Sequence, residues 1–333
     1  MQGKGMKQLS RIVRSVKAFS QEMARQRDPL EAHTRPLPRP KLGLAFGGGF
    51  ARGLAHIGIL KVLEEEKIPV DFVGGTSVGA VIGAAFASGV GPKEMEEIAQ
   101  LVRFKDFARW TISRFGMCSN DRMSGFLDRL VRVKKFEELR IPLVVAATDF
   151  VTGEGVVFNS GSLIDAVRAS CAYPGMFLPV SINGRLLVDG LLGYPVPSKP
   201  LKELGADRVI SVHLSAHWVK SRGPRHVFEV IGQCFSIAQD KMRAGWEAHS
   251  DLVLEPAVGD FGYDSFARAS DLIKIGADAI RAALPTIRSW YAGTELDAAA
   301  AVQPEIKPAA TPEIAPVESP LSVPSTTVPE AAA

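Results

Sequence analysis

The chain has 333 residues, 46% of them hydrophobic, which is enough to bury one large core. Its net charge of +3 is unevenly spread, because residues 1–40 carry +6 and the remaining residues sum to −3. The body is therefore not a basic nucleic-acid platform, and we expect no nucleic-acid partner. Three scattered cysteines show no metal-ligand or redox spacing, and they fit a reducing cytosol.

Residues 1–40 predict a basic amphipathic leader that ends in a proline-rich spacer. Apolar residues recur at three- and four-residue steps over residues 6–23, and basic residues occupy the other face. Such a helix either lies on an anionic membrane surface or docks on the body or on a partner. No apolar stretch typical of a secretory signal occurs before residue 41. We expect a cytoplasmic protein that its leader can hold at the inner face of the membrane.

The body is predicted to begin with a short strand at residues 42–46, followed by a glycine-rich loop and a helix. This order makes an anion site from backbone N–H groups. The loop lacks the Lys-Ser/Thr pair of a P-loop, and its glycine spacing does not match a dinucleotide fingerprint. An oxyanion hole is the better interpretation, and its candidate residues are Gly47, Gly48, Gly49, Phe50, Ala51, Arg52 and Gly53.

A second strand is predicted at residues 68–73 and an uncharged helix at residues 78–88. The sequence between them, Gly75-Thr76-Ser77-Val78-Gly79, fits a nucleophile elbow, in which a serine lies on a sharp strand-to-helix turn. Gly75 and Gly79 are the elbow glycines, because side chains there would collide. A tight glycine-rich turn in an α/β core is the simpler interpretation of the same residues.

The rest of the body alternates predicted strands and helices. Aromatic and basic residues mix over residues 92–133, which indicates either an apolar wall or lid that takes up acyl chains, or ordinary core helix. A hairpin around Asn183-Gly184 delivers Asp189-Gly190 at a strand end. Further strands are expected at residues 141–148 and 209–214, and helices at residues 163–172, 227–242 and 266–283. Residues 292–333, rich in alanine and proline, are predicted to be disordered.

A serine nucleophile needs a base that takes its proton. Asp189 is one candidate, since it ends a predicted strand and is followed by a glycine that lets the chain turn away. His213, at the end of the predicted strand 209–214, is the other, since an α/β-hydrolase would place its triad histidine there. His56 falls inside a buried helix and is interpreted as a packed residue. The residue types by themselves leave a Ser–Asp dyad and a triad open.

Three ordered motifs, Gly48-Gly49-x-x-Arg52-Gly53, Gly75-x-Ser77-x-Gly79 and Asp189-Gly190, resemble the patatin-like phospholipase family. The resemblance is closest to the bacterial branch related to the catalytic domain of neuropathy target esterase. It covers about residues 41–280 and continues in Arg168-Ala169-Ser170 and Pro174-Gly175-x-Phe177. It implies a three-layer α/β/α fold with a mainly parallel central sheet, and a dyad of Ser77 and Asp189 without histidine. It also implies an oxyanion hole around Gly48 and Gly49, and no metal or other cofactor.

The function implied by the resemblance is that of a serine lipid acyl hydrolase acting on phospholipids or lysophospholipids at a membrane surface. The alternatives are a soluble thioesterase or short-chain esterase, and a catalytically silent lipid-binding module. Two departures bear on the substrate range: Phe50 replaces a frequent third glycine, and Leu191 replaces a small residue. We predict a leader at residues 1–40, a hydrolase domain at residues 41–291 and a tail at residues 292–333. The sequence predicts no particular oligomeric state.

Overall fold

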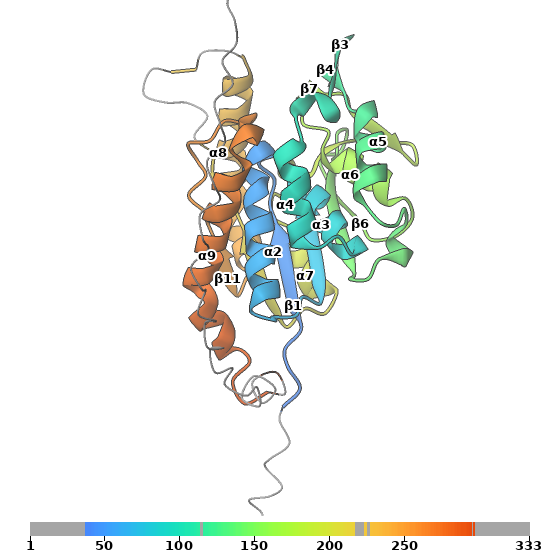
Figure 1. Cartoon of the computed structure of the whole chain (residues 1–333). Coiled ribbons are helices and arrows are strands. Elements are labelled where there is room, and N and C mark those ends of the chain that lie inside the picture. Colours follow the sequence, from blue (N-terminus) through green and yellow to red (C-terminus); the bar gives the residue numbers. More distant parts are fainter. Residues whose placement is uncertain (1–36, 114–115, 217–222, 225–226, 295, 297–333) are drawn as a thin grey trace, which may run out of the picture.

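The computed structural model describes residues 37–113, 116–216, 223–224, 227–294 and 296 (Figure 1). Residues 1–36 of the predicted leader and residues 297–333 of the predicted tail lie outside the described residues, and the predictions for them stay predictions. The packed body extends slightly beyond the predicted domain. Leu37 donates its backbone N–H to the Gly293 carbonyl at 3.2 Å, and Thr294 is buried.

A mixed sheet with a parallel centre forms the middle of the body. Its strand order is β11-β10-β1-β2-β5-β9-β8, with β6 also paired to β5. The strands β11, β10, β1, β2 and β5 run parallel, and the hairpin strands β9, β8 and β6 run antiparallel. Every residue of β1 and β5 is buried, as expected for parallel strands covered on both faces. The bounds of these strands are β1 Leu42–Phe46, β2 Phe72–Thr76, β5 Leu143–Asp149, β6 Gly155–Phe158, β8 Val180–Ile182, β9 Arg185–Asp189, β10 Arg208–Val212 and β11 Leu252–Leu254.

Helices cover both faces of the sheet and give the three-layer arrangement predicted from the sequence. Figure 1 shows α2 beside α9 and α4 near α3 in front of the sheet, with α7 behind it. On the α7 face, Leu201 packs with Ala45 and Val144 in a separate apolar cluster. The helices are α2 Ala55–Glu65, α3 Val78–Ser88, α4 Pro92–Leu101, α5 Asp121–Leu130, α6 Leu163–Ser170, α7 Ser198–Glu203, α8 Val227–Glu247 and α9 Ala269–Ser289.

Two parts of the fold differ from the sequence prediction. The strand expected at residues 68–73 begins only at Phe72, because the Asp71 carboxylate turns back to the Leu42 N–H at 2.8 Å and to the Arg39 guanidinium at 2.7 Å. The segment 92–133 was expected to be wall or core helix, but it also contains two strands. These are β3 (Arg109–Ser113) and β4 (Gly116–Ser119), which form a small separate sheet with β7 (Gly175–Phe177).

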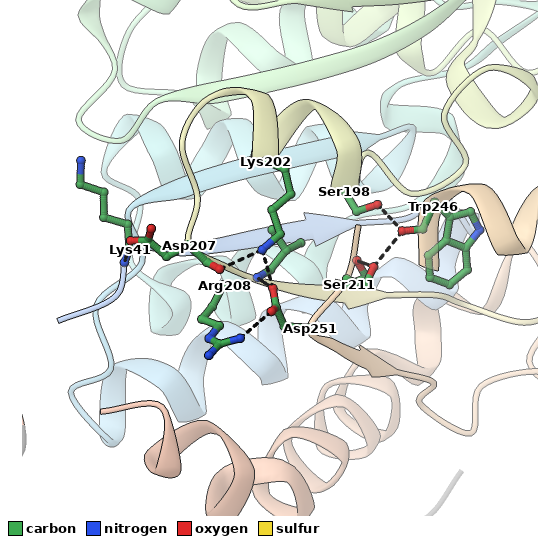
Figure 2. Close-up of polar contacts among 10 residues, drawn as sticks. Lys41, Ser198, Lys202, Asp207, Arg208, Ser211, Trp246 and Asp251 are labelled. Atoms are coloured by element: carbon green, nitrogen blue, oxygen red, sulfur yellow. Dashed lines mark hydrogen bonds and ion pairs between the residues drawn. The ribbon is translucent and has the colours of Figure 1, made fainter. Parts of the chain in front are cut away.

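Hydrogen bonds around Asp251 join α7, β10 and the segment after α8 (Figure 2). The Asp251 carboxylate accepts from Lys202 Nζ at 2.7 Å, Arg208 Nη1 at 2.8 Å and the Val209 N–H at 2.8 Å. Burial raises the pKa of Asp251, but these hydrogen bonds outweigh it and hold the pKa below its ordinary value. The network holds the start of β10 against α7 and the segment before β11. It lies at the amino ends of the parallel strands, whereas the glycine-rich loop follows the carboxyl end of β1.

Candidate active site

Ser77 lies on a strained turn between β2 and α3. Its backbone has φ of 56° and ψ of −125°, a conformation that non-glycine residues rarely adopt. A Cβ atom at Gly75 would lie 2.4 Å from the Gly79 carbonyl oxygen, and one at Gly79 would lie 2.3 Å from the Phe46 carbonyl oxygen. Glycine is therefore required on both sides of Ser77. The turn is held from outside, since the Ser77 N–H donates to Ser170 Oγ at 2.8 Å.

The sheet register brings Asp189 to the level of Ser77. Thr76, the last residue of β2, is opposite Ala146 on β5, and Asp189 is opposite the next residue, Ala147. Ser77 and Asp189 are therefore placed on the two sides of β5, although they are far apart in the sequence. The backbone of Asp189 is fixed on both sides: its N–H donates to the Ala172 carbonyl and its carbonyl accepts from Thr148 Oγ1.

The Asp189 carboxyl group is fully buried. Its Oδ1 accepts from the Leu191 N–H at 3.1 Å, whereas its Oδ2 has no hydrogen-bond partner of normal geometry within the described part of the chain. Burial raises the pKa of Asp189 to about 7, against the opposing effects of hydrogen bonding to the Ser77 side chain and to the Leu191 N–H. A carboxyl with this pKa can exchange a proton with a neighbouring group near neutral pH.

The glycine-rich loop lies against Ser77. A Cβ atom at Gly48 would be 3.1 Å from the Ser77 Cβ, which makes this part of the loop its immediate neighbour. Among the described residues, the N–H groups of Gly48 and Gly49 have no protein acceptor. Three other amides of the loop already donate within the fold, at 3.0 to 3.2 Å: Gly47 to Val212, Ala51 to Tyr263 and Arg52 to Gly49. The candidate oxyanion donors thus centre on Gly48 and Gly49.

The remaining residues of the loop shape it. Phe50 has a positive φ of 52° and starts the short 3-10 helix η2 (Phe50–Leu54), in which Gly53 packs on Val78 at the start of α3. Arg52 is buried and its Nε donates to the Phe261 carbonyl at 2.8 Å. Burial lowers the pKa of Arg52 to about 10, with Tyr173 opposing the shift. The His56 ring, fully buried as a packed helix residue, reaches the Gly47 carbonyl oxygen at 3.0 Å and fixes the start of the loop.

Two cavities of different character meet at Ser77 and Phe50. One, of about 100 Å³, is almost entirely apolar, and among its walls are Val81, Ile98, Phe107, Phe126, Phe177 and Phe266. The other, of about 210 Å³, is half polar, and among its walls are Arg52, Tyr173, Asp189, His213, Ser236 and Gln239. Ser77 and Phe50 line both cavities. A molecule with an apolar part and a polar part could therefore present their junction to the serine hydroxyl.

The position of His213 bears on whether this residue could serve as the base for Ser77. It lines the polar cavity, where its ring packs on Trp246 with 5.5 Å between the ring centroids. In the part of the chain that the structure describes, no hydrogen bond joins its ring to Ser77 or Asp189. Burial lowers the pKa of His213, so the ring favours its neutral form.

The sequence reasoning did not assign roles to Ser170 and Cys171, at the end of α6. Ser170 holds the Ser77 turn, as described above. The Cys171 thiol lies beside the candidate dyad: burial and the nearby Asp189 raise its pKa well above the ordinary value, while a hydrogen bond with Ser77 opposes them. The motif Arg168-Ala169-Ser170 was a signal for these positions. However, nothing in the sequence shows that the end of α6 meets the turn before α3.

A patatin-like phospholipase family model matches residues 44–202. An uncharacterized NTE family protein of Mycobacterium tuberculosis is 33% identical over 202 residues, covering 56% of this chain and 52% of that protein. The patatin-like phospholipase domain-containing protein 6 of Homo sapiens is 32% identical over 213 residues, covering 60% of this chain and 15% of that protein. The solved structure of VipD from Legionella pneumophila has 14% identity and a TM-score of 0.44, covering 75% of this chain and 68% of that one.

Residues 44–202 thus match the patatin-like phospholipase family, and the proteins similar to the chain include NTE family proteins. The resemblance read from the three motifs is thereby confirmed, and so is the α/β fold with its mainly parallel central sheet. The chain spans about half the length of the bacterial relatives that it matches. Among the described helices, none has both the length and the hydropathy needed to cross a membrane.

Proposed function

We propose that the chain is a serine acyl hydrolase that releases fatty acids from phospholipids or lysophospholipids. The observation that carries the proposal is the position of Ser77, at the junction of an apolar cavity and a polar one. An acyl chain fits the first cavity, and the alcohol part of the lipid fits the second. The ester group between them would then lie next to the serine hydroxyl. The phospholipase family of the domain supports lipid hydrolysis in broad terms.

In the proposed mechanism, Asp189 takes the proton of the Ser77 hydroxyl while the serine oxygen attacks the ester carbonyl. The N–H groups of Gly48 and Gly49 stabilise the negative charge that develops on the carbonyl oxygen. The C–O bond to the alcohol then breaks, the alcohol takes the proton from Asp189, and the acyl group remains on Ser77. Water attacks this acyl-enzyme, giving its proton to Asp189, and the fatty acid leaves as Ser77 recovers its proton.

The pKa of Asp189 supports this assignment. A value of about 7 means that a substantial fraction of the carboxyl groups is ionised at neutral pH and can accept the serine proton. A base with an ordinary aspartate pKa would be ionised more fully but would hold the proton more weakly. His213 lies in the polar cavity and is not required in this mechanism. We assign it to the surroundings of the alcohol part of the substrate.

The proposal is tested by fluorophosphonate labelling of the full chain, with the modified residue located by mass spectrometry. Labelling at Ser77 that is lost in Asp189→Asn and kept in His213→Ala supports the Ser–Asp dyad. Loss in His213→Ala with retention in Asp189→Asn contradicts the dyad and favours a triad. Ser77→Ala is the control for labelling at any other residue.

Substrate assays then separate the enzyme classes. Release of fatty acid from lysophospholipid micelles or phospholipid vesicles, at a higher rate than from soluble short-chain esters and thioesters, is the expected result. Turnover of the soluble substrates alone would replace the proposal with a soluble thioesterase or short-chain esterase. Lipid binding that is unaffected by Ser77→Ala, with no turnover of any ester, would replace it with a silent lipid-binding module.

A further inference from the structure

The small sheet β3–β4–β7 carries large apolar side chains that face solvent. Leu101, at the end of α4, is 77% exposed, Trp110 on β3 is 68% exposed and Met117 on β4 is 39% exposed. Figure 1 shows this sheet at one end of the molecule, at the top of the view, while the start of β1 lies at the other end. We call this surface the hairpin face and define it by Leu101, Arg103, Lys105, Arg109, Trp110, Met117 and Arg122. Because Trp110 pairs with Cys118, the Trp110 and Met117 side chains project from opposite sides of the β3–β4 ribbon.

A row of aromatic rings connects the hairpin face to the apolar cavity. The Trp110 ring lies 6.5 Å from that of Phe104, measured between centroids. Phe104 in turn lies 5.3 Å from Phe107 and 6.1 Å from Phe177, which are both walls of the apolar cavity beside Ser77. A single ring, Phe104, therefore separates an exposed indole from the cavity wall. Exposed apolar side chains that are continuous with a cavity lining are unusual for a surface that faces only water.

The charge of the same surface is positive. It carries four exposed basic side chains, and the acidic residues of the segment 101–122 are Asp106 and Asp121. Asp106 accepts from the Arg103 N–H at 2.7 Å, and Asp121 lies 3.5 Å from Arg109 and 3.8 Å from Arg168. Both acids are thus engaged, Asp121 partly by Arg109 of the same surface. The guanidinium groups of Arg103 and Arg122 also donate to backbone carbonyls. Among the described residues, the exposed Lys105 ammonium has no ion-pair partner.

We propose that the hairpin face docks on the surface of an anionic lipid bilayer. Tryptophan is favoured at the level of lipid headgroups, because its ring is apolar and its N–H is polar. Each basic side chain near an anionic leaflet adds attraction that salt weakens. In the docked position, the β3–β4 ribbon enters the interface with Trp110 on the side of Phe104 and Met117 on the other side. The basic side chains then lie near lipid phosphates, and an acyl chain can pass along Phe104 to the cavity.

The last step, delivery of an acyl chain to Ser77, rests on the proposed function, whereas docking itself does not. The proposal also differs from the prediction for the leader, because it assigns membrane contact to the folded body. A second exposed apolar row on α8, formed by Val227, Val230 and Ile237, lies on the helix that packs on β7 through Ile231 and Gly175. This row extends the same end of the molecule and is compatible with the same docked orientation.

The test uses the full chain with Ser77→Ala, so that binding is measured without any hydrolysis. Co-sedimentation is compared on vesicles of phosphatidylcholine and on vesicles that also contain phosphatidylglycerol. The test variants are Trp110→Ser and Lys105→Glu. Their matched controls are Leu37→Ser, 66% exposed, and Lys41→Glu, both at the opposite end of the sheet. Figure 2 shows the Lys41 side chain extending away from the polar contacts around it.

We expect tighter binding to the anionic vesicles and a loss in both test variants but in neither control. Lys105→Glu should weaken binding at least about fivefold, since one basic residue near an anionic surface contributes about 1 kcal/mol. Trp110→Ser should weaken it about tenfold or more, from the apolar area that the indole removes from water. Brominated lipid should quench the tryptophan emission of the parent protein, and Trp110→Phe should remove most of this quenching.

Equal binding by the test variants and their controls would overturn the proposal and assign membrane contact to another part of the chain. Equal binding to the two kinds of vesicle, or no binding to either, would overturn it as well. Unfolding midpoints of all variants, compared with the parent, identify any loss that comes from misfolding. Failure of the proposed function would appear separately, as absence of ester turnover in the chain with Ser77 intact.

Discussion

Removal of the Asp189 charge should stabilise the fold at alkaline pH. The carboxyl group is fully buried, and its pKa of about 7 shows that burial outweighs the hydrogen bonds that favour ionisation. Asparagine has nearly the same shape and can still accept from the Leu191 N–H through its side-chain oxygen. Asp189→Asn therefore removes a buried charge while it keeps the packing and the known hydrogen bond.

The magnitude and the sign follow from the two pKa values. Between the ordinary value of 3.8 and the folded value of about 7, the folded state holds a proton that the unfolded state has released. The wild-type free energy of unfolding therefore falls as the pH rises through this window, and it levels off above about pH 7. Three pKa units correspond to about 4 kcal/mol. The stability gained by Asp189→Asn should grow from near zero at about pH 4 to at most about 4 kcal/mol at pH 8.

The assay is urea unfolding of the wild type and of Asp189→Asn at several pH values across this window, with equal m-values as the test of comparability. Asp128→Asn is the matched control, since its side chain is 48% exposed and has no buried charge to remove. A difference in the free energy of unfolding between Asp189→Asn and wild type that stays constant with pH would refute the reasoning. A lower free energy of unfolding for Asp189→Asn than for wild type at pH 8 would refute it as well. Either result would mean that the surroundings stabilise the ionised carboxylate, contrary to the burial argument.

Three further predictions concern the surroundings of Ser77. Phe50→Gly relieves a positive φ and opens the wall that the two cavities share. The variant should shift the preference in kcat/KM toward bulkier acyl chains. An unchanged dependence of kcat/KM on chain length would contradict the role of Phe50. Ser170→Ala leaves the Ser77 N–H without its acceptor. In steady-state kinetics, this variant should have a kcat that is lower by about tenfold or more, with little change in KM. Ser170→Thr keeps the hydroxyl and should recover part of the lost kcat. His56→Gln should flatten the acid limb of stability. Burial lowers the pKa of His56 to about 4, so the free energy of unfolding of the wild type falls by up to about 3 kcal/mol as the pH falls from about 6.5 to 4. Urea unfolding of His56→Gln that shows the same fall over this pH range would refute this prediction.

Local spacing was sufficient to predict the motifs and most of the elements that carry them. The glycines at 75 and 79 indicated the turn at Ser77, and the clashes that side chains would make there explain why. The Asn183-Gly184 pair predicted a hairpin, and both residues have the positive φ that such a turn requires. The uncharged run predicted α3 at residues 78–88, with the bounds that the structure has. The small sheet at β3 and β4 was missed, because its partner β7 comes from a distant part of the sequence.

The sequence by itself determined the order of the motifs and the turn that exposes Ser77, because each depends on residues that are neighbours along the chain. The mainly parallel sheet followed from the family resemblance, since its strands pair across distant segments. Only the tertiary structure decided that Asp189 lies level with Ser77 across β5, that Ser170 holds the turn and that Phe50 borders two cavities. The pKa of Asp189 belongs to the same group of properties. Burial and register depend on which distant segments pack together, and the free energy of placing a carboxyl group in the interior is set by those neighbours rather than by the adjacent residues.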